Sequence, residues 1–338
     1  MTVQEIIKQL DSLLEKNEKK SISEDISSLI DILNNNGFVD DYLNNELKQI
    51  QDTLTVDRMH YYINRLKKAI TEIKTTKYND LNMNQWKIYE DIITDSLWII
   101  DKRDSSGVHN AGYWGNFIPQ IPNQLIKRYT KKGEWVLDTF SGSGTTIIEA
   151  LRQGRNCLGI ELNPEVVKIS NDLITTEKKV LENKGISEVI NGNSETVNLK
   201  LHLKKHNQKS VQLIIMHPPY WDIIKFSDDK NDLSNAKTSE LFLDAFGKVV
   251  DNVFKYLDKD RFLAVVIGDK YSKDELIPLG FQTMNEILKR KFKLKSIIVK
   301  NFEGTTGKRG QDKLWRYRAL MGGFYIFKHE YILLFQKL

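Results

Sequence analysis

Residues 136–146 read VLDTFSGSGTT, and this stretch decides the fold. Its apolar start predicts a short buried strand that ends at Asp138, and a helix is expected from about Thr145 after a glycine-rich turn. In open α/β sheets, ligands bind beside the carboxyl ends of the strands. Gly142 and Gly144 let the backbone approach a ligand at positions where a Cβ atom would clash. The stretch therefore predicts an α/β sheet with a ligand-binding loop after its first strand.

The spacing of this loop limits the kind of ligand. Its pattern D-x-F-x-G-x-G is neither the dinucleotide fingerprint G-x-G-x-x-G nor a Walker loop, and no G-K-[ST] follows that would cradle phosphates. The next predicted strand, NCLGIE, ends in Glu161. An acid at the tip of a second strand can accept hydrogen bonds from both hydroxyls of a ribose. The two features together predict a nucleoside-containing cofactor.

Short apolar runs alternate with helical patterns from about residue 120 to the end of the sequence. The predicted strands are Trp135–Asp138, Asn156–Glu161, Val211–Met216, Phe262–Gly268, Leu294–Lys300 and Tyr331–Gln336. Helical patterns between them include Thr145–Gln153, Glu240–Leu257 and Leu279–Lys291. This alternation predicts a doubly wound, mostly parallel α/β sheet with helices on both faces.

Residues 1–85 have a different texture, with one glycine, no proline and apolar residues at helical spacing. The run Asn34-Asn35-Asn36-Gly37 predicts a helix end and a turn. We predict an all-helical N-terminal domain over 1–85 and a second domain over 86–338 that carries the sheet. The N-terminal domain could serve as a support or dimerisation unit, or it could contact DNA.

Composition excludes several classes of protein. Cys157 is the only cysteine of the 338 residues, which excludes an intrachain disulfide and a cysteine-based zinc cluster. The N-terminus lacks the apolar core of a signal peptide, and no segment has the ~20 apolar residues of a membrane span. We therefore predict a cytoplasmic protein without membrane contact. The net charge of +5 permits nucleic-acid binding without requiring it.

His202 and His206 lie four residues apart and could in principle grip a metal from one helical face. Their segment, HLKKH, lacks the glutamate of the H-E-x-x-H zinc motif and is rich in lysine. We interpret it as a solvated helix face and predict no metal site.

The run VQLIIMHPPYWD places His217, Pro218, Pro219 and Tyr220 at the end of an apolar strand. Two consecutive prolines fix φ, remove two amide donors and hold the preceding carbonyl in one direction. A rigid carbonyl acceptor and an adjacent aromatic ring suit a flipped base, whose amino group would donate to position 217 while the ring stacks on the base. We predict that these four residues form the catalytic turn.

These motifs together resemble those of the amino-group DNA methyltransferases, the N-4/N-6 family. VLDTFSGSGTT and GIELNPE resemble motifs I and II, GNFIPQIPNQLIKRYT resembles motif X, INGNSETV resembles motif III and HPPY resembles motif IV. The resemblance implies the seven-stranded class I methyltransferase sheet and S-adenosylmethionine as cofactor. It also implies three groups of cofactor-binding residues: Asp138, Phe140, Gly142, Gly144 and Glu161 at the amino-acid end and ribose, Asn116, Phe117 and Pro119 at the methionine moiety, and Asn193 and Ser194 near the adenine.

Motif IV departs from the family pattern at its first residue. The family has Asp, Asn or Ser there, and Asp or Asn generally accompanies adenine N6 chemistry whereas Ser accompanies cytosine N4 chemistry. His217 matches neither, which leaves the base open. A neutral imidazole could accept from the amino group, or His217 could be a pocket wall beside a working backbone carbonyl. Methylation at cytosine C5 is disfavoured, because it needs a reactive thiolate and Cys157 lies inside an apolar strand.

The motif order X, I, IV matches the gamma arrangement, which normally carries a target-recognition domain after the catalytic sheet. Here KHEYILLFQKL resembles motif VIII, the last strand, so DNA recognition is expected from other segments. The glycine-flanked loop 302–328 is basic and aromatic, which suits contacts with phosphates and bases. Its candidate DNA-binding residues are Lys308, Arg309, Lys313, Trp315, Arg316 and Arg318. A second loop, 223–238, contains Asp228, Asp229 and Asp232 and is expected to close over the base pocket.

The sequence thus predicts a site-specific methyltransferase that acts on double-stranded DNA at cytosine N4 or adenine N6. Such enzymes mark host DNA beside a restriction enzyme or in phage defence, so a restriction endonuclease or specificity subunit is a candidate partner. The chain is expected to be a monomer or a homodimer. Two other readings remain: an RNA or protein methyltransferase with a Pro-Pro-Tyr motif, and a catalytically degenerate partner subunit that binds DNA.

Overall fold

The computed structural model describes residues 2–35, 41–109, 112–113, 115–182, 185–272, 275–302 and 312–338. Contacts divide the chain into two units, Met1–Asp91 and Ile92–Leu338. The sequence prediction placed the boundary between its two domains at residue 85. Among the helices that the structure describes, none is both long and apolar enough to cross a membrane.

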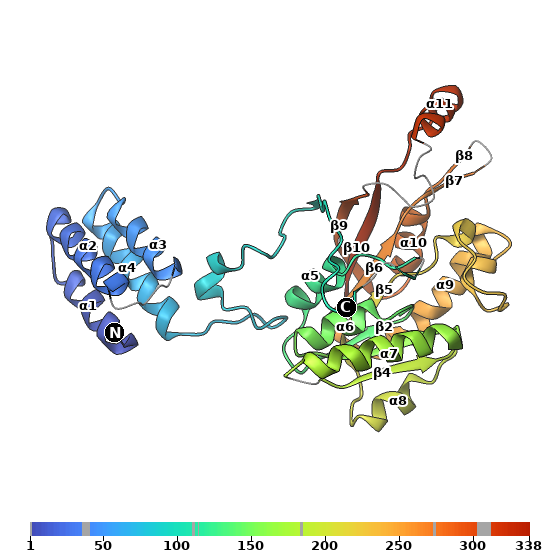
Figure 1. Cartoon of the computed structure of the whole chain (residues 1–338), viewed down its shortest axis with the longest axis horizontal. Coiled ribbons are helices and arrows are strands. Elements are labelled where there is room, and N and C mark those ends of the chain that lie inside the picture. Colours follow the sequence, from blue (N-terminus) through green and yellow to red (C-terminus); the bar gives the residue numbers. More distant parts are fainter. Residues whose placement is uncertain are drawn as a thin grey trace. The chain divides into compact units, whose positions relative to one another are not determined.

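The first unit is helical, as its 3.6-residue periodicity requires. Its helices are α1 (Val3–Leu14), α2 (Lys19–Asn35), α3 (Asp41–Gln51) and α4 (Val56–Thr71), followed by the 3-10 helix η1 (Met83–Ile88) (Figure 1). Helix α1 begins with a capping box in which Thr2 and Glu5 each satisfy the other's backbone amide. The apolar stripes of α1–α4 pack into one core, to which α1 contributes Ile6, Leu10 and Leu13.

The second unit contains an eight-stranded sheet in the order β1-β9-β10-β6-β5-β2-β3-β4. All neighbouring strands are parallel except those that pair with β10. The strands are β1 (Leu97–Trp98), β2 (Trp135–Asp138), β3 (Asn156–Glu161), β4 (Ser187–Asn191), β5 (Val211–Met216), β6 (Leu257–Ile267), β9 (Phe292–Asn301) and β10 (His329–Lys337). The resemblance implied seven strands, and β1, a two-residue strand at the edge of the sheet, is the additional one.

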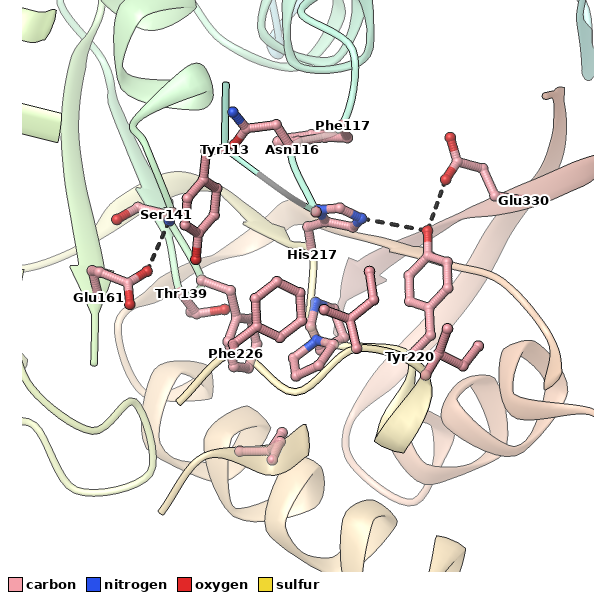
Figure 2. A pocket seen from close by; sticks show the side chains of 18 of the residues that line it. Tyr113, Asn116, Phe117, Thr139, Ser141, Glu161, His217, Tyr220, Phe226 and Glu330 are labelled. Carbon is pink, nitrogen blue, oxygen red and sulfur yellow. Dashed lines mark hydrogen bonds between the residues drawn. The ribbon is translucent and has the colours of Figure 1, made fainter. Parts of the chain in front are cut away.

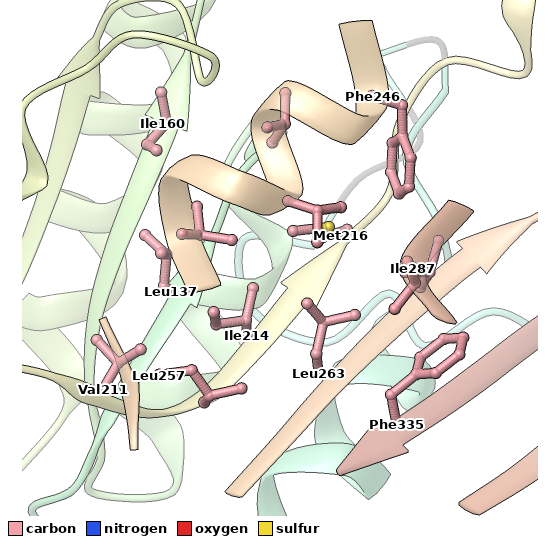
Figure 3. Close-up of a cluster of buried hydrophobic side chains, with 14 of the residues drawn as sticks. Leu137, Ile160, Val211, Ile214, Met216, Phe246, Leu257, Leu263, Ile287 and Phe335 are labelled. Carbon is pink, nitrogen blue, oxygen red and sulfur yellow. The ribbon is translucent and has the colours of Figure 1, made fainter. Parts of the chain in front are cut away.

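Helices cover both faces of this sheet, which confirms the predicted doubly wound α/β class (Figure 1). One face carries α5 (Gln120–Tyr129), α6 (Thr145–Arg152) and α7 (Pro164–Val180), and the other carries α8 (Leu199–Lys205), α9 (Ser239–Phe254) and α10 (Leu279–Leu288). Alternate strand residues such as Leu137, Ile214 and Leu263 point into the second layer, where they meet Phe246 and Ile287 (Figure 3). Because strand side chains alternate between faces, one short apolar strand supplies both cores.

Several elements differ from the prediction. Strand β4 was not predicted, because only one of its five residues is buried and the apolar signal is therefore weak. The hairpin of β7 (Lys270–Ser272) and β8 (Glu275–Ile277) was also missed. The segment 302–328 is not wholly a loop, since Asp312–Gly322 forms helix α11. Leu, Arg, Ala and Met in this stretch are good helix formers, and they outweigh the flanking glycines.

Candidate active site

The loops after β2, β3 and β5 meet at one edge of the sheet, because the three strands are parallel and in register. Asp138 at the end of β2 lies beside Gly159 of β3 and Ile215 of β5. A cavity of about 600 Å³ opens at this edge (Figure 2). Its walls come from the segments that the sequence singled out, 115–118, 139–142, 161–163, 193–194 and 217–220, and from the loop 223–233. Two sites predicted separately are therefore parts of one cavity.

Asp138 holds the backbone of the glycine-rich loop through a hydrogen bond. Its side chain is fully buried, and Oδ1 accepts a hydrogen bond of 2.9 Å from the backbone N–H of Phe140. Burial raises the pKa of Asp138 to about 6. Oδ2 has no hydrogen-bond partner among the residues that the structure describes. Asp138 does not line the cavity, so its observed contact is with the loop itself.

The loop bends at Gly142, where φ is +49°. A Cβ atom at Gly142 would lie 3.1 Å from the ring of Tyr113, which faces the cavity. Gly144 has a φ of +90°, and a Cβ there would lie 2.5 Å from Oγ of Ser170 in α7. Gly142 therefore lets the Tyr113 ring lie close to the loop, whereas Gly144 allows α6 to pack closely on α7.

Glu161 ties the tip of β3 to the loop. Its Oε2 accepts from the N–H of Gly142 at 3.0 Å, and its Oε1 accepts from the N–H of Asn163 at 2.8 Å. Burial raises the pKa of Glu161. Since each carboxylate oxygen has a second lone pair, both can still accept from a ligand in the cavity.

The segment before α5 forms the opposite wall. Asn116 donates from Nδ2 to Oγ of Ser143 at 2.7 Å, and the buried ring of Phe117 lies 4.8 Å from the His217 ring, centroid to centroid. Arg103 fixes this segment by donating to the carbonyl oxygens of Asn116 and Phe117, at 3.3 and 2.9 Å. Pro119 is buried as the N-cap residue of α5 and does not line the cavity.

Residues 193–194 form another part of the cavity wall. The side chain of Ser194 donates to the carbonyl of Thr139 at 2.6 Å, and the side chain of Asn193 accepts from the backbone N–H of Glu195. Seven of the ten predicted cofactor-binding residues therefore line the cavity, and three do not. The seven are Asn116, Phe117, Phe140, Gly142, Glu161, Asn193 and Ser194, and the three are Pro119, Asp138 and Gly144.

The Pro-Pro turn places His217 and Tyr220 side by side at the cavity. The Tyr220 hydroxyl lies 3.3 Å from Nε2 of His217 and donates to Oε2 of Glu330 at 2.7 Å (Figure 2). Burial, and then the positive charge of Lys300, lower the pKa of His217 to about 4. Burial also raises the pKa of Tyr220, with Glu330 adding to the effect. At neutral pH His217 is therefore an uncharged imidazole, the form that can accept a hydrogen bond.

Among the cavity side chains that sequence reasoning missed are Tyr113, Lys300 and Glu330. Lys300 and Glu330 form an ion pair of 3.1 Å between β9 and β10, and both side chains are almost completely buried. The available signal was a charged residue in each of two otherwise apolar strands. Charged side chains are almost never fully buried unless they are paired, so the two residues could have been expected to pair with each other.

The loop 223–238 contributes to the cavity wall through Phe226, Ser227, Asn231, Asp232 and Leu233. It contains the 3-10 helix η3 (Leu233–Asn235), which follows η2 (Trp221–Ile223). Asp232 is buried and accepts from Ser227 and from the N–H of Ser234, whereas Asp228 is exposed and pairs with Lys225. The three aspartates of this loop therefore do not act as one group.

Two other predictions can be compared with the structure. Cys157 is buried and free, and burial raises the pKa of its thiol, as expected for an inert cysteine. The prediction of a solvated face for His202 and His206 was wrong, because both imidazoles contact Glu188, at 2.9 and 2.7 Å. His206 also packs against Trp135. The described residues contain no group of side chains that could hold a metal ion.

The predicted DNA-binding residues lie partly on α11. Lys313, Arg316 and Arg318 are exposed, and Trp315 lies under the guanidinium of Arg318 at 5.2 Å. Lys308 and Arg309 lie outside the described residues. No residue of α11 whose burial the structure describes is buried.

The strand order itself identifies a class. β9-β10-β6-β5-β2-β3-β4, with β10 alone antiparallel, is the sheet of the class I S-adenosylmethionine-dependent methyltransferases, with β1 added at its edge. The sequence model of the N-6/N-4 DNA methylase family matches residues 13–172 and 211–338. The chain belongs to this family, and the family implies S-adenosylmethionine as the methyl donor.

The chain is similar to part of the length of three named relatives. The chain is 36% identical over 98 residues to the Type II methyltransferase M.BglI of Bacillus subtilis, which covers 29% of this chain and 26% of the relative. It is 25% identical over 180 residues to the Type II methyltransferase M.MjaII of Methanocaldococcus jannaschii, covering 48% and 31%. It is 38% identical over 102 residues to the Type II methyltransferase M2.DpnII of Streptococcus pneumoniae, covering 29% and 34%. The matched segments thus span about a third or less of each of these relatives.

Proposed function

We propose that the chain transfers a methyl group from S-adenosylmethionine to the exocyclic amino group of a flipped base in double-stranded DNA. One observation carries the proposal: the glycine loop with Glu161 and the turn with His217 and Tyr220 line a single cavity. Family membership supports DNA as the substrate. The acceptor would be cytosine N4 or adenine N6.

The residues at the loop end of the cavity fit the cofactor. Gly142 lines the cavity with backbone atoms alone, which suits a close approach of the ligand to the loop. Glu161 keeps free lone pairs on both carboxylate oxygens, which suits a pair of ribose hydroxyls. When bound, the cofactor supplies a methyl carbon that is electrophilic because it is attached to a sulfonium. Carboxylates of Asp101, Glu161 and Asp232 line the same cavity, and their negative charge favours a cationic ligand.

The residues at the other end would hold the base. The Tyr220 ring and the rigid turn before it would stack on and position the flipped base, and the carbonyl at position 217 would accept one proton of its amino group. The loop 223–233 would shield the cavity from water. In this arrangement the amine lone pair would point toward the methyl group. The chain would contribute by orienting the two reacting groups and by excluding water from the cavity.

Relatives named as Type II methyltransferases support a role in restriction and modification. A restriction endonuclease or a specificity subunit is then the expected partner, and the chain would act as a monomer or homodimer. The helical unit would serve as a support, as a dimerisation surface or as a DNA contact.

Incubation of the purified chain with methyl-labelled cofactor tests the proposal. Duplex DNA, total tRNA and a protein mixture are offered in parallel, and the label is expected in DNA. Label in tRNA or protein alone would assign a different substrate class. Tight DNA binding without any transfer would instead indicate a degenerate partner subunit.

We further propose that α11 and the β7–β8 hairpin form a DNA-contacting arm. Both follow strands whose carboxyl ends lie at the cavity edge, and Tyr271 stacks on Phe324 at a centroid distance of 4.3 Å (Figure 1). The exposed Arg316 and Arg318 place positive charge on this arm. Charges so placed would contact phosphates and position the duplex over the cavity.

Replacing both Arg316 and Arg318 by glutamine is expected to weaken DNA binding about 10-fold and to lower the slope of log K against log salt by about 2. The Kd for the cofactor should not change. Lys204 and Lys209 are exposed near the amino end of β5, at the opposite edge of the sheet, and their double glutamine variant is the matched control. Equal losses in both variants would contradict a specific role for α11.

A further inference from the structure

A series of buried polar contacts, called the relay below, joins strands β9 and β10 to the turn at His217–Tyr220. Lys300 pairs with Oε1 of Glu330 at 3.1 Å, and the Tyr220 hydroxyl lies 2.7 Å from Oε2 of the same carboxylate. The Tyr220 oxygen in turn lies 3.3 Å from Nε2 of His217. Lys300 and Glu330 come from β9 and β10, far in sequence from the turn that they contact. Burying both charges of the Lys300–Glu330 ion pair costs desolvation free energy, so we ask what the pair does for the site.

The hydrogen bonds of the relay have a defined direction, because the Glu330 carboxylate can only accept a hydrogen bond. A carboxylate held by an ammonium has no proton to donate, so the single proton of the Tyr220 hydroxyl must point to Glu330. The Tyr220 oxygen then offers a lone pair to His217. For the contact with Nε2 to be a hydrogen bond, Nε2 must carry the imidazole proton.

This direction leaves the other ring nitrogen of His217 unprotonated. Its pKa of about 4 means that the ring carries a single proton at neutral pH. Nδ1 makes no hydrogen bond within the part of the chain that the structure describes. His217 lines the cavity, and Phe117 covers the face of its ring. The relay thus leaves a free acceptor on a side chain at the cavity wall.

We propose that Glu330, held by Lys300, is a positioning residue that fixes the tautomer of His217 so that Nδ1 accepts a proton of the target amino group. This inference rests on the proposed function. During transfer the amine nitrogen bonds to the methyl carbon while the bond from that carbon to sulfur breaks, and its electron pair stays on sulfur. The proton that the methylated nitrogen must lose passes to Nδ1 and later to solvent.

The isosteric variant Glu330→Gln tests the direction of the relay. Lys300 would hold the amide oxygen, which leaves the amide NH2 to donate to the Tyr220 oxygen. The Tyr220 hydroxyl would then donate to Nε2 of His217, and the ring proton would move to Nδ1. Lys300→Met also breaks the ion pair but keeps the carboxylate acceptor, so it should preserve the wild-type tautomer. Lys295→Met, at an exposed position of the same strand, is the control.

The tautomer can be read directly from 15N–1H spectra of histidine-labelled protein at pH 7.5 without DNA. The wild type, Lys300→Met and Lys295→Met should carry the His217 proton on Nε2, and Glu330→Gln should carry it on Nδ1. Tyr220→Phe removes the hydroxyl and keeps the ring, so both tautomers should appear. A proton on Nδ1 in the wild type, or on Nε2 in Glu330→Gln, would overturn the proposal.

Kinetics provide a second readout. Glu330→Gln is expected to lower kcat on DNA by about 10- to 100-fold, with KM for the cofactor within about twofold of wild type. Lys300→Met leaves a negative charge near His217, so the acid limb of its pH–rate profile should move from about 4 to higher pH. The other charged or titratable groups around the cavity are Asp101, Arg103, Tyr113, Glu161, Tyr220 and Asp232.

The two readouts separate the inference from the function on which it rests. The spectra need no substrate, so a failure of DNA methylation would leave the tautomer result intact. If methylation occurs and Glu330→Gln changes neither the tautomer nor kcat, the ion pair is a structural feature only and the inference is wrong.

Discussion

Tyr220→Ala is expected to lower kcat/KM for DNA methylation by about 100-fold, because a lost base–aromatic stack costs about 1–3 kcal/mol and the loss of His217 positioning adds to it. The Kd for S-adenosylmethionine should stay within about threefold of wild type, because Tyr220 belongs to the turn that we propose to hold the base and not to the loop that we propose to hold the cofactor. Single-turnover methylation and isothermal titration with the cofactor measure the two quantities.

Leu201→Ala, at an exposed residue of α8 near the opposite edge of the sheet, is the control and should leave both quantities unchanged. Full methylation by Tyr220→Ala would mean that the turn does not hold the base. A loss of cofactor affinity equal to the loss of rate would mean that Tyr220 supports the fold of the cavity rather than the transfer step.

The second large effect is expected for Glu161→Gln, whose Kd for S-adenosylmethionine should rise by about 30-fold or more. The carboxylate accepts from the N–H groups of both Gly142 and Asn163. A glutamine can accept only one of them, so its NH2 would face a backbone donor, and a buried unpaired donor costs about 1–3 kcal/mol. The charge-assisted bonds to the ribose would also be lost.

Glu165→Gln, an exposed neighbour that pairs with Lys168 on α7, is the control and should bind the cofactor normally. Calorimetry or fluorescence titration measures the affinity. An unchanged Kd in Glu161→Gln would contradict the assignment of this end of the cavity to the cofactor. Melting curves of both variants separate a loss of binding from a loss of folding.

The parts of the site carried by short contiguous motifs could be predicted from the sequence. Strand, turn and helix occur together in residues 136–146, and an acid ends the next strand at Glu161, so local order places both beside the cavity. The rigid turn at Pro218 and Pro219 is likewise a local signal. Parallel strands bring such loops to one edge, which is why three separate motifs meet.

The parts that depend on pairing between distant strands could not be predicted. Lys300 and Glu330 lie next to each other only because β9 and β10 are antiparallel, with Glu330 opposite Lys300 in the register. A lysine near the end of one strand and a glutamate in another have no local pattern that joins them. The link to Tyr220 needs a third segment, 110 residues before Glu330 in the sequence.

The two glycines of the loop show that prediction from sequence is limited even within a local motif. Gly142 and Gly144 look equivalent in the sequence, yet only Gly142 lines the cavity, whereas Gly144 allows α6 to approach Ser170 of α7. Asp138 was expected to touch the cofactor, but its described contact is the N–H of Phe140. Spacing fixes where such residues lie along the chain, and the packing of α7 and the loop decides what each contacts.

The departure at His217 gains a physical basis from the structure. The sequence left open whether a histidine in motif IV could act as an acceptor, because its charge was unknown. Burial and Lys300 keep the ring neutral at neutral pH, and the contact with Tyr220 defines which nitrogen is engaged. A neutral imidazole can accept a hydrogen bond, as the side-chain oxygen of Asp, Asn or Ser can at this position in the family.

The identity of the methylated nucleoside tests the central claim most directly. Purified chain is incubated with unmethylated duplex DNA and cofactor carrying a deuterated methyl group, and the digested nucleosides are analysed by mass spectrometry. The account predicts the label on N4-methylcytosine or N6-methyladenine, at recurring sequence positions, and its absence with Tyr220→Ala. Label on C5-methylcytosine, or label found only when tRNA or protein replaces DNA, would contradict it.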